Sequence, residues 1–236
     1  MSDILTMVWK ESKDVFFQGG WRSLLRPLIV VGIMGIYLPL QLGPQWVELT
    51  PLGMLLLLWI PFFVIISFIG DVIAGERERH TLETLLASRM PDRAILLGKV
   101  VTTVLYAWGM SVLSLLLGLV LVGLFRTQGN WMFYPLDLFV DALVLSLLVG
   151  VLGASAGTLI SLKVATVRQA QQILSVGTIV FVFGILFVVQ AVPANVVSSL
   201  TYAQFLLIAM VVIAVLDAIL LGLSLVSFQR SRLILS

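Results

Sequence analysis

Six long apolar blocks, separated by short polar segments, dominate the pattern of hydrophobic and polar positions along the chain. They cover approximately residues 27–42, 52–74, 96–125, 138–162, 173–192 and 200–228. A block of about 20 apolar residues has the length of a helix that crosses a hydrocarbon core about 30 Å thick. The pattern therefore predicts an all-α polytopic membrane protein with six transmembrane helices. The first block is short and contains Pro39, near which a kink is expected.

A shorter amphipathic pattern precedes the first block, within residues 1–26. One side of the helix that it predicts carries Leu5, Val8, Trp9, Ser12, Val15 and Phe16, and the other side carries Lys10, Glu11, Lys13 and Asp14. Such a pattern favours a helix that lies in the membrane interface. A short cytoplasmic helix packed on the protein itself is the alternative.

Composition strengthens the membrane interpretation. Of the 236 residues, 60% are hydrophobic and 11% are charged, against roughly 45–50% and about 25% in a soluble domain. These values exclude a water-soluble fold, so residues 1–236 are expected to form a single transmembrane domain. The absence of cysteine excludes disulfides and thiolate metal sites. The net charge of +2 is small, and no nucleic-acid partner is expected.

Basic residues collect on one side of the predicted spans, and basic residues in short loops stay on the cytoplasmic side of a membrane. Thirteen of the 14 Lys and Arg residues precede the first span, follow the sixth, or lie between spans two and three or four and five. This distribution predicts a multi-pass protein of the inner (cytoplasmic) membrane with both termini in the cytoplasm. Trp46, Trp131 and Tyr134 then suit an aromatic belt at the outer interface.

The longest polar stretch, residues 75–95, lies between the second and third blocks. Thr81 can cap a short helix there, and Pro91 would stop it. The apolar face of this helix would consist of Leu82, Leu85 and Leu86. Because a helix of about two turns is not stable alone in water, the face must dock on the chain's own helix ends or on another protein.

The same stretch resembles the signature of the type-2 ABC transporter permeases. It reads Gly75-Glu76-Arg77-Glu78, then Thr81-Leu82-Glu83 and Leu85-Leu86, with Pro91 and Gly98-Lys99 further on. The family commonly reads G-E-R-E-x-G-T-L-E-x-L-L, then a proline, then G-K at the start of the third span. His80 departs from this pattern, since the family usually has glycine there. The amphipathic N-terminal helix, the six spans and the short outer loops extend the resemblance to nearly the whole chain.

The resemblance implies that this segment is a cytoplasmic coupling element that contacts a separate ABC ATPase subunit. The residues expected to take part are Glu76, Arg77, Glu78, Thr81, Leu82, Glu83, Leu85, Leu86 and Arg89. It further implies ATP-driven export, a pathway formed by two identical or closely related permease subunits, and ATP and Mg bound by the partner. The sequence agrees, because it contains no G-x-x-x-x-G-K-[ST] phosphate loop.

Two other classes of function also fit a helical membrane protein. A membrane scaffold or assembly protein would recruit a cytoplasmic partner through the same loop without moving a substrate. A secondary transporter is disfavoured by the few intramembrane charges and by the absence of an inverted repeat. No nucleophile–base pair or metal-ligand cluster is visible, so no catalytic centre, cofactor or metal site is expected in this chain. Among cargoes, lipids, drugs, peptides, glycans and ions stay open, and the apolar walls favour amphipathic or lipid-like molecules.

Two intramembrane features also carry expectations. Asp217 lies about 20 Å along its helix from Arg230, near mid-membrane. An acid at this depth is a candidate functional residue by default, and a structural hydrogen-bonding role and a role in the pathway are equally open. Gly150, Gly153 and Gly157 have the spacing of a close helix contact, which we interpret as internal packing in preference to a dimer seam.

Overall fold

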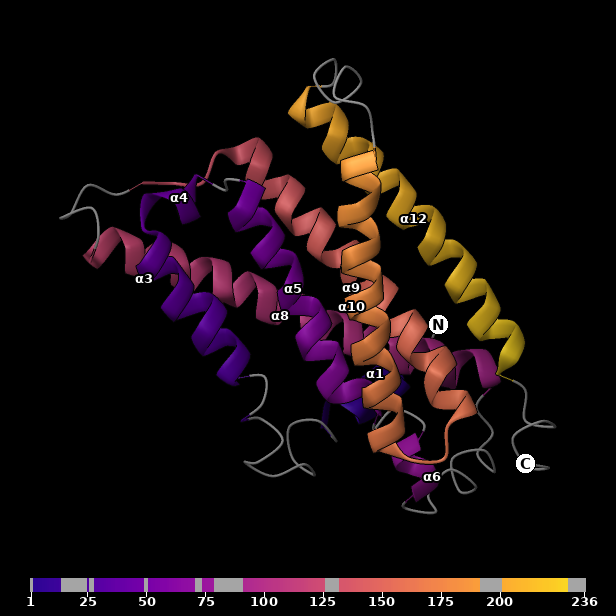
Figure 1. The fold of residues 1–236 in the computed structure, drawn as a ribbon. Coiled ribbons are helices and arrows are strands. Elements are labelled where there is room, and N and C mark those ends of the chain that lie inside the picture. The colour runs from indigo at the N-terminus through magenta and orange to yellow at the C-terminus, as the bar shows by residue number, and fades with distance from the viewer. Residues whose placement is uncertain are drawn as a thin grey trace.

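The computed structural model of the chain is a bundle of helices (Figure 1). It describes residues 2–13, 25, 28–48, 51–70, 74–78, 91–125, 132–191 and 201–228. No strand occurs among these residues. The all-α prediction is therefore confirmed for the part of the chain that the structure describes.

Helices occupy the predicted apolar blocks. The elements are α1 (Ser2–Lys13), the π-helix η2 (Gly32–Tyr37), α3 (Leu38–Leu42), α4 (Pro44–Val47), α5 (Pro51–Gly70), α6 (Glu76–Glu78), α8 (Asp92–Phe125), α9 (Leu136–Lys163), α10 (Val167–Ala191) and α12 (Tyr202–Ser227). By length and composition, α8, α9 and residues Ala203–Ser227 of α12 can each cross a membrane. Leu28–Leu42 and Leu56–Ile66 form shorter apolar helices among the described residues. The total of six spans stays a prediction.

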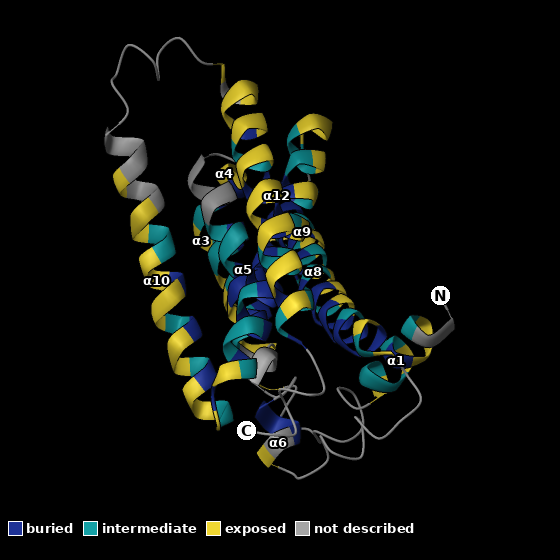
Figure 2. Cartoon of the chain, turned by 90° about the vertical axis from the view of Figure 1, so that its right-hand side faces the viewer, coloured by how far each residue is buried: buried dark blue, intermediate teal, exposed yellow. Residues whose placement is uncertain are grey.

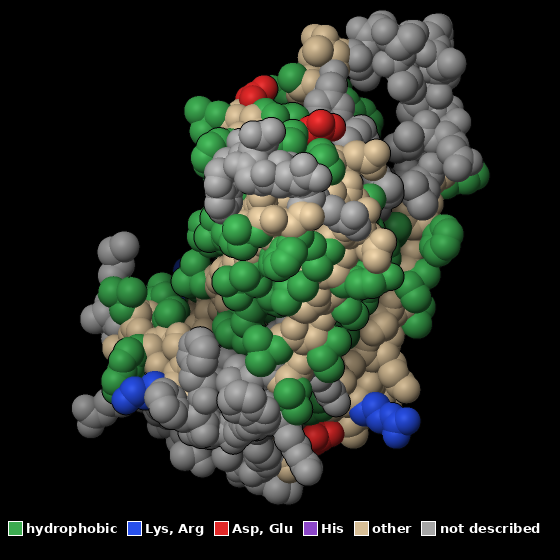
Figure 3. All heavy atoms as spheres, turned by 90° about the vertical axis from the view of Figure 1, so that its left-hand side faces the viewer, with side chains coloured by type: hydrophobic (Ala, Val, Ile, Leu, Met, Phe, Trp, Pro, Cys, Tyr) green, Lys and Arg blue, Asp and Glu red, His purple; other side chains and the backbone are tan. Residues whose placement is uncertain are grey.

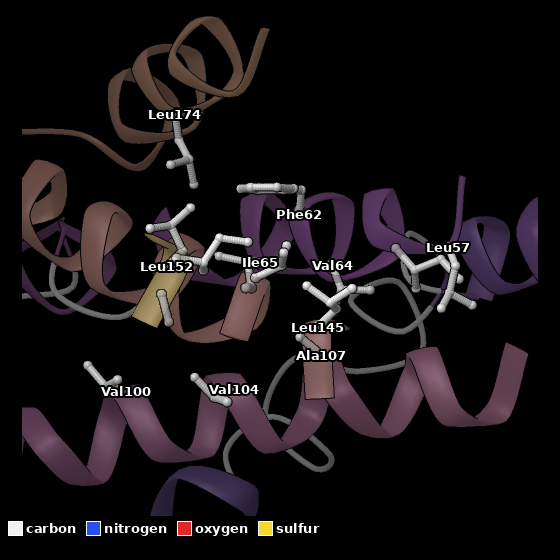
Figure 4. Packing of buried hydrophobic residues seen from close by; sticks show 14 of the residues in the cluster. Leu57, Phe62, Val64, Ile65, Val100, Val104, Ala107, Leu145, Leu152 and Leu174 are labelled. Carbon is white, nitrogen blue, oxygen red and sulfur yellow. The ribbon is translucent and has the colours of Figure 1, made fainter. Parts of the chain in front are cut away.

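Helix α9 lies at the centre of the packing, in contact with α5, α8, α10 and α12. Its small residues permit these contacts, as at Gly153, where an added Cβ would lie 3.0 Å from Cδ1 of Ile65 on α5. Gly150 and Gly157 are buried as well. Apolar side chains from α5, α8, α9 and α10 meet in one cluster around Ile65 and Leu152 (Figure 4). The prediction that these glycines serve internal packing is confirmed.

The outward faces of the bundle are apolar. Large hydrophobic side chains are exposed along α10 and α12, as the yellow stretches of both helices show (Figure 2). On the face drawn in Figure 3, hydrophobic side chains cover the middle of the molecule, and the charged side chains lie near its two ends. Exposure of such an apolar band is unfavourable in water and favourable in the hydrocarbon core of a membrane.

The first apolar block is irregular around Pro39, and the kink expected there stays a prediction. The π-helix η2 runs directly into α3, whose second residue is Pro39, and a proline within a continuous helix removes one backbone hydrogen bond. Gly43 follows with a positive φ of 58°, which turns the chain into α4. Trp46 is a buried residue of the short helix α4 that follows this turn.

Trp46 was expected in an aromatic belt, and that expectation is wrong. Its side chain is only 1% exposed and packs against Gly118 of α8. Tyr134 is partly buried, and its hydroxyl donates a 2.9 Å hydrogen bond to the carbonyl of Leu115. Trp131 lies outside the described residues. The aromatic side chains at this end therefore serve, where they are described, to pack α4 and the segment before α9 onto α8.

Candidate functional site

The structure describes only the beginning of the predicted coupling segment. Residues 79–90 lie outside the described residues, and with them Thr81, Leu82, Glu83, Leu85, Leu86 and Arg89. The side chain of Arg77 is likewise not described. Residues 74–78 are described, and they include Glu76 and Glu78 of the predicted set. The contacts of this short segment show how the chain holds the start of the loop.

Two hydrogen bonds fasten the segment to α9 and α10. The backbone N–H of Ala74 donates to the hydroxyl Oγ of Ser161 on α9 at 2.9 Å, in a buried position. Oε1 of Glu78 accepts from the backbone N–H of Val167 at 3.0 Å. Val167 is the first residue of α10, where a helix has N–H groups without intrahelical partners. Both bonds therefore hold the start of the coupling segment at the turn between α9 and α10.

A buried ion-pair network fastens the same segment to α8 and α1. Nζ of Lys99, on α8, lies 2.9 Å from Oε1 of Glu76 and 3.1 Å from Oε1 of Glu11 on α1. Lys10 joins at longer range, with its Nζ 3.6 Å from Glu11 and 3.8 Å from Glu76. We call these four residues the Lys99 network. It brings together three segments that are far apart in the sequence.

Burial gives this network its energetic weight. The Lys99 side chain is only 2% exposed, whereas the side chain of Lys10 is 42% exposed. A buried ammonium group is costly unless paired and hydrogen-bonded, and removing one partner of such a pair is strongly destabilising. Two carboxylates balance the two lysines, so the network as a whole is neutral. The arrangement therefore favours α1 and α6 remaining in place together around Lys99.

Close backbone approach brings α1 to this position. Met7 of α1 is fully buried and lies directly over Gly98, the residue before Lys99. A Cβ atom at Gly98 would meet Cβ and Cγ of Met7 at 2.6 Å, so only glycine permits this spacing. Packing of α1 on the protein itself, the alternative to an interfacial position, is thus present on the Met7 and Glu11 side.

The opposite side of α1 is exposed and apolar. Leu5 is 69% and Trp9 is 63% exposed, and Nζ of Lys13 lies 3.8 Å from the ring centroid of Trp9. Such side chains are typical of a helix at a membrane surface. The two interpretations of the N-terminal pattern are therefore compatible, and the interfacial one stays a prediction.

Sequence reasoning did not assign Glu11 or Lys99 to the site. Glu11 was placed on a polar side of α1, and Gly98-Lys99 was quoted only as part of the family signature. The sequence did contain an indication. Lys99 was counted with the cytoplasmic segment between spans two and three, but it lies within the first residues of the apolar block 96–125, and an ionisable residue inside a span is a functional candidate by default. The coupling role predicted for Glu76 and Glu78 stays a prediction, although both side chains already have partners within the chain.

Asp217 forms a separate polar site on α12. It is 5% exposed, and neither carboxylate oxygen has a hydrogen-bond partner among the described residues. α12 packs against α9, and Asp217 is among the few buried residues of α12. The expectation that Asp217 is hydrogen-bonded to a neighbouring helix therefore finds no support in the described part of the chain.

Comparison with known proteins supplies the family. A search of curated proteins finds no match for this chain. The family model described as ABC-2 family transporter protein matches residues 48–236, which is most of the chain and includes the coupling segment, Gly98 and Lys99. The match begins after α1, so Glu11 and Met7 lie outside it. The resemblance read from the sequence is thereby confirmed. Membership of this family implies a multi-pass membrane component that works with an ABC ATPase subunit. The chain belongs to the ABC-2 transporter family.

Proposed function

We propose that this chain is the permease subunit of an ATP-driven exporter. Family membership supports a transport role, and the outward direction is what the sequence resemblance implies. The observation that carries the proposal is the fastening of residues 74–78 to α1, α8, α9 and α10. A segment held to four helices at once can pass a force from a bound ATPase into the bundle.

The proposed ATPase contact is the stretch that follows this fastened segment. The apolar face predicted for it from the sequence would consist of Leu82, Leu85 and Leu86, and charged residues flank these positions in the sequence. Apolar anchors within a charged rim are the usual anatomy of a protein interface. ATP and Mg would be bound by the partner, which would supply the energy for transport.

The proposed setting is the inner (cytoplasmic) membrane, with six spans and with both termini in the cytoplasm. The distribution of basic residues supports this orientation. Two permease subunits, identical or closely related, would form the pathway between them. The exposed apolar faces of α10 and α12 are available for lipid or for the second subunit.

The test is co-purification of the ATPase with permease variants, together with ATP-dependent transport in membrane vesicles. Leu85→Asp should abolish association with the ATPase, because it places a charge at the centre of the apolar face. Arg89→Ala should have a milder effect, because rim ion pairs are typically worth less than about 1 kcal/mol. Thr84→Asp is the matched control, because helical spacing places Thr84 on the opposite side of the same short helix.

Two results would contradict the proposal. Leu85→Asp with normal association and normal transport would mean that the loop is not the coupling element. Association of a partner without any ATP-dependent movement of cargo, across a screen of lipid-like and drug-like probes, would favour the scaffold function instead.

A further inference from the structure

We infer that Lys99 is a positioning residue that makes the N-terminal helix α1 move together with the start of the coupling loop. The inference rests on the proposed function in one respect, since the force on the loop would come from the ATPase. It goes beyond that function by giving α1, which the family match does not cover, a place in the transport cycle.

One ammonium group holds both segments. Oε1 of Glu76 and Oε1 of Glu11 lie 2.9 Å and 3.1 Å from Nζ of Lys99. Glu76 is the first residue of α6, and the proposed ATPase contact follows α6 in the sequence. If Glu76 moved alone, Lys99 would keep one carboxylate partner, the partly buried Glu11. Burial makes such a separation costly, because attraction between charges is stronger away from water.

The contacts of α1 with α8 allow α1 to follow a movement of Glu76. Helix α1 docks on α8 through the close packing of Met7 on Gly98 and through the ion pair between Glu11 and Lys99. Both contacts therefore hold α1 to two adjacent residues of α8. A displacement of Glu76 and Lys99 therefore carries Glu11 with it, and with Glu11 the whole of the short helix.

The exposed side of α1 suits contact with the membrane surface. Leu5 and Trp9 point away from the bundle and are mostly exposed. These side chains suit the boundary between headgroups and acyl chains. Movement of the loop would thereby be passed to the membrane surface beside the bundle.

The experiment follows α1 in the complete complex. The chain contains no cysteine, so a single cysteine at Leu5 can carry an environment-sensitive fluorophore. The permease with its ATPase is placed in nanodiscs of phosphatidylcholine and phosphatidylglycerol. Fluorescence is compared without nucleotide and after trapping with ATP, Mg and vanadate. In the otherwise unchanged protein, trapping should shift the fluorescence.

The decisive variant is the triple substitution Lys99→Met, Glu11→Gln and Glu76→Gln. Lys99→Met alone leaves two carboxylates without their buried cation and can fail to fold, whereas the triple variant leaves no buried charge unbalanced. Lys10 is partly exposed and stays solvated. The triple variant should melt near the temperature of the unchanged protein. Because Glu76 belongs to the predicted coupling segment, the fluorescence is compared at equal amounts of bound ATPase, and the variant should then lose most of the shift. Lys163→Met, at an exposed lysine on α9, should keep the full shift.

Three results would overturn the inference. They are a full shift in the triple variant, equal loss in Lys163→Met, and no shift in the unchanged protein with the ATPase bound. Failure of the proposed function has a different signature, because the ATPase would then not co-purify with the unchanged permease at all. A purely structural network would be seen as a lowered melting temperature in the triple variant with the shift retained.

Discussion

Replacing Gly98 by alanine should push α1 away from α8. A Cβ atom at this position would lie 2.6 Å from both Cβ and Cγ of Met7. Rotation about χ1 of Met7 moves Cγ but leaves Cβ in place, so the backbone of α1 has to shift. Overpacking of this kind typically costs about 1–3 kcal/mol.

Gly109→Ala on the same helix is the matched control, since nothing lies within 4 Å of a Cβ atom there. Both variants gain the helix preference of alanine over glycine, about 0.5–1 kcal/mol, and this gain cancels when they are compared. The remaining difference of about 1–3 kcal/mol corresponds to about 5–150-fold in the docking equilibrium of α1.

The docking equilibrium can be read from thiol labelling. In a Met7→Cys background the sulfur occupies the place of Cγ, so the two atoms that the new Cβ would strike are kept. Met7 is fully buried, so a water-soluble maleimide reacts at this position only when α1 opens, and its rate follows the open population. Labelling should be about 5–150 times faster with Gly98→Ala than with Gly109→Ala. Equal rates in the two variants would refute the docking of α1 through Met7 and Gly98.

Three further predictions follow from described contacts or from charge. Gly118→Ala should unfold more easily in detergent than Gly109→Ala by about 1–3 kcal/mol, because its Cβ would overlap Nε1 of Trp46; equal melting temperatures would contradict that packing. Asp217→Leu should melt at least as high as Asp217→Asn, because neither oxygen of Asp217 has a partner among the described residues and an unpaired buried polar group costs about 1–3 kcal/mol. A clearly lower melting temperature for the leucine variant would reveal a partner. A cysteine at Ser88 should react with an impermeant thiol reagent in inverted membranes and stay unlabelled in intact cells, and labelling of intact cells would reverse the predicted topology.

The long helices could be predicted from the sequence because a lipid-exposed backbone must satisfy its own hydrogen bonds. The apolar blocks at 96–125 and 138–162 correspond to Asp92–Phe125 and Leu136–Lys163 within a few residues. The helices extend past the apolar blocks at their polar ends, since hydropathy records the membrane core and helical hydrogen bonding continues beyond it. Trp46 was misplaced for a different reason. The space that receives its ring exists because Gly118, on another helix, has no side chain, and no local pattern around Trp46 reports this.

The candidate site could be predicted only in part. The run Gly75-Glu76-Arg77-Glu78 identified Glu76 and Glu78 as candidates, because its residues are contiguous in the sequence. Glu11 looked like a solvent-facing residue, since the amphipathic pattern of α1 describes that helix alone. Its partner Lys99 is brought to it by the packing of α1 on α8. The roles of Gly98 and Lys99 in docking therefore become visible only when both helices are in place.

The Lys99 network also explains which side of α1 faces outward. Desolvation offsets much of the attraction in a buried ion pair. Well-packed apolar residues in place of Lys99, Glu11 and Glu76 would therefore stabilise the fold about equally. An apolar α1 could, however, dock on the apolar surface of α8 through several faces, including the one that carries Leu5 and Trp9. The pairing of Glu11 with the buried ammonium group of Lys99 selects one rotation of the helix. That rotation places Met7 over Gly98 and leaves Leu5 and Trp9 exposed. The charges are therefore better explained by the orientation they impose on α1, and by its link to Glu76, than by the stability they add.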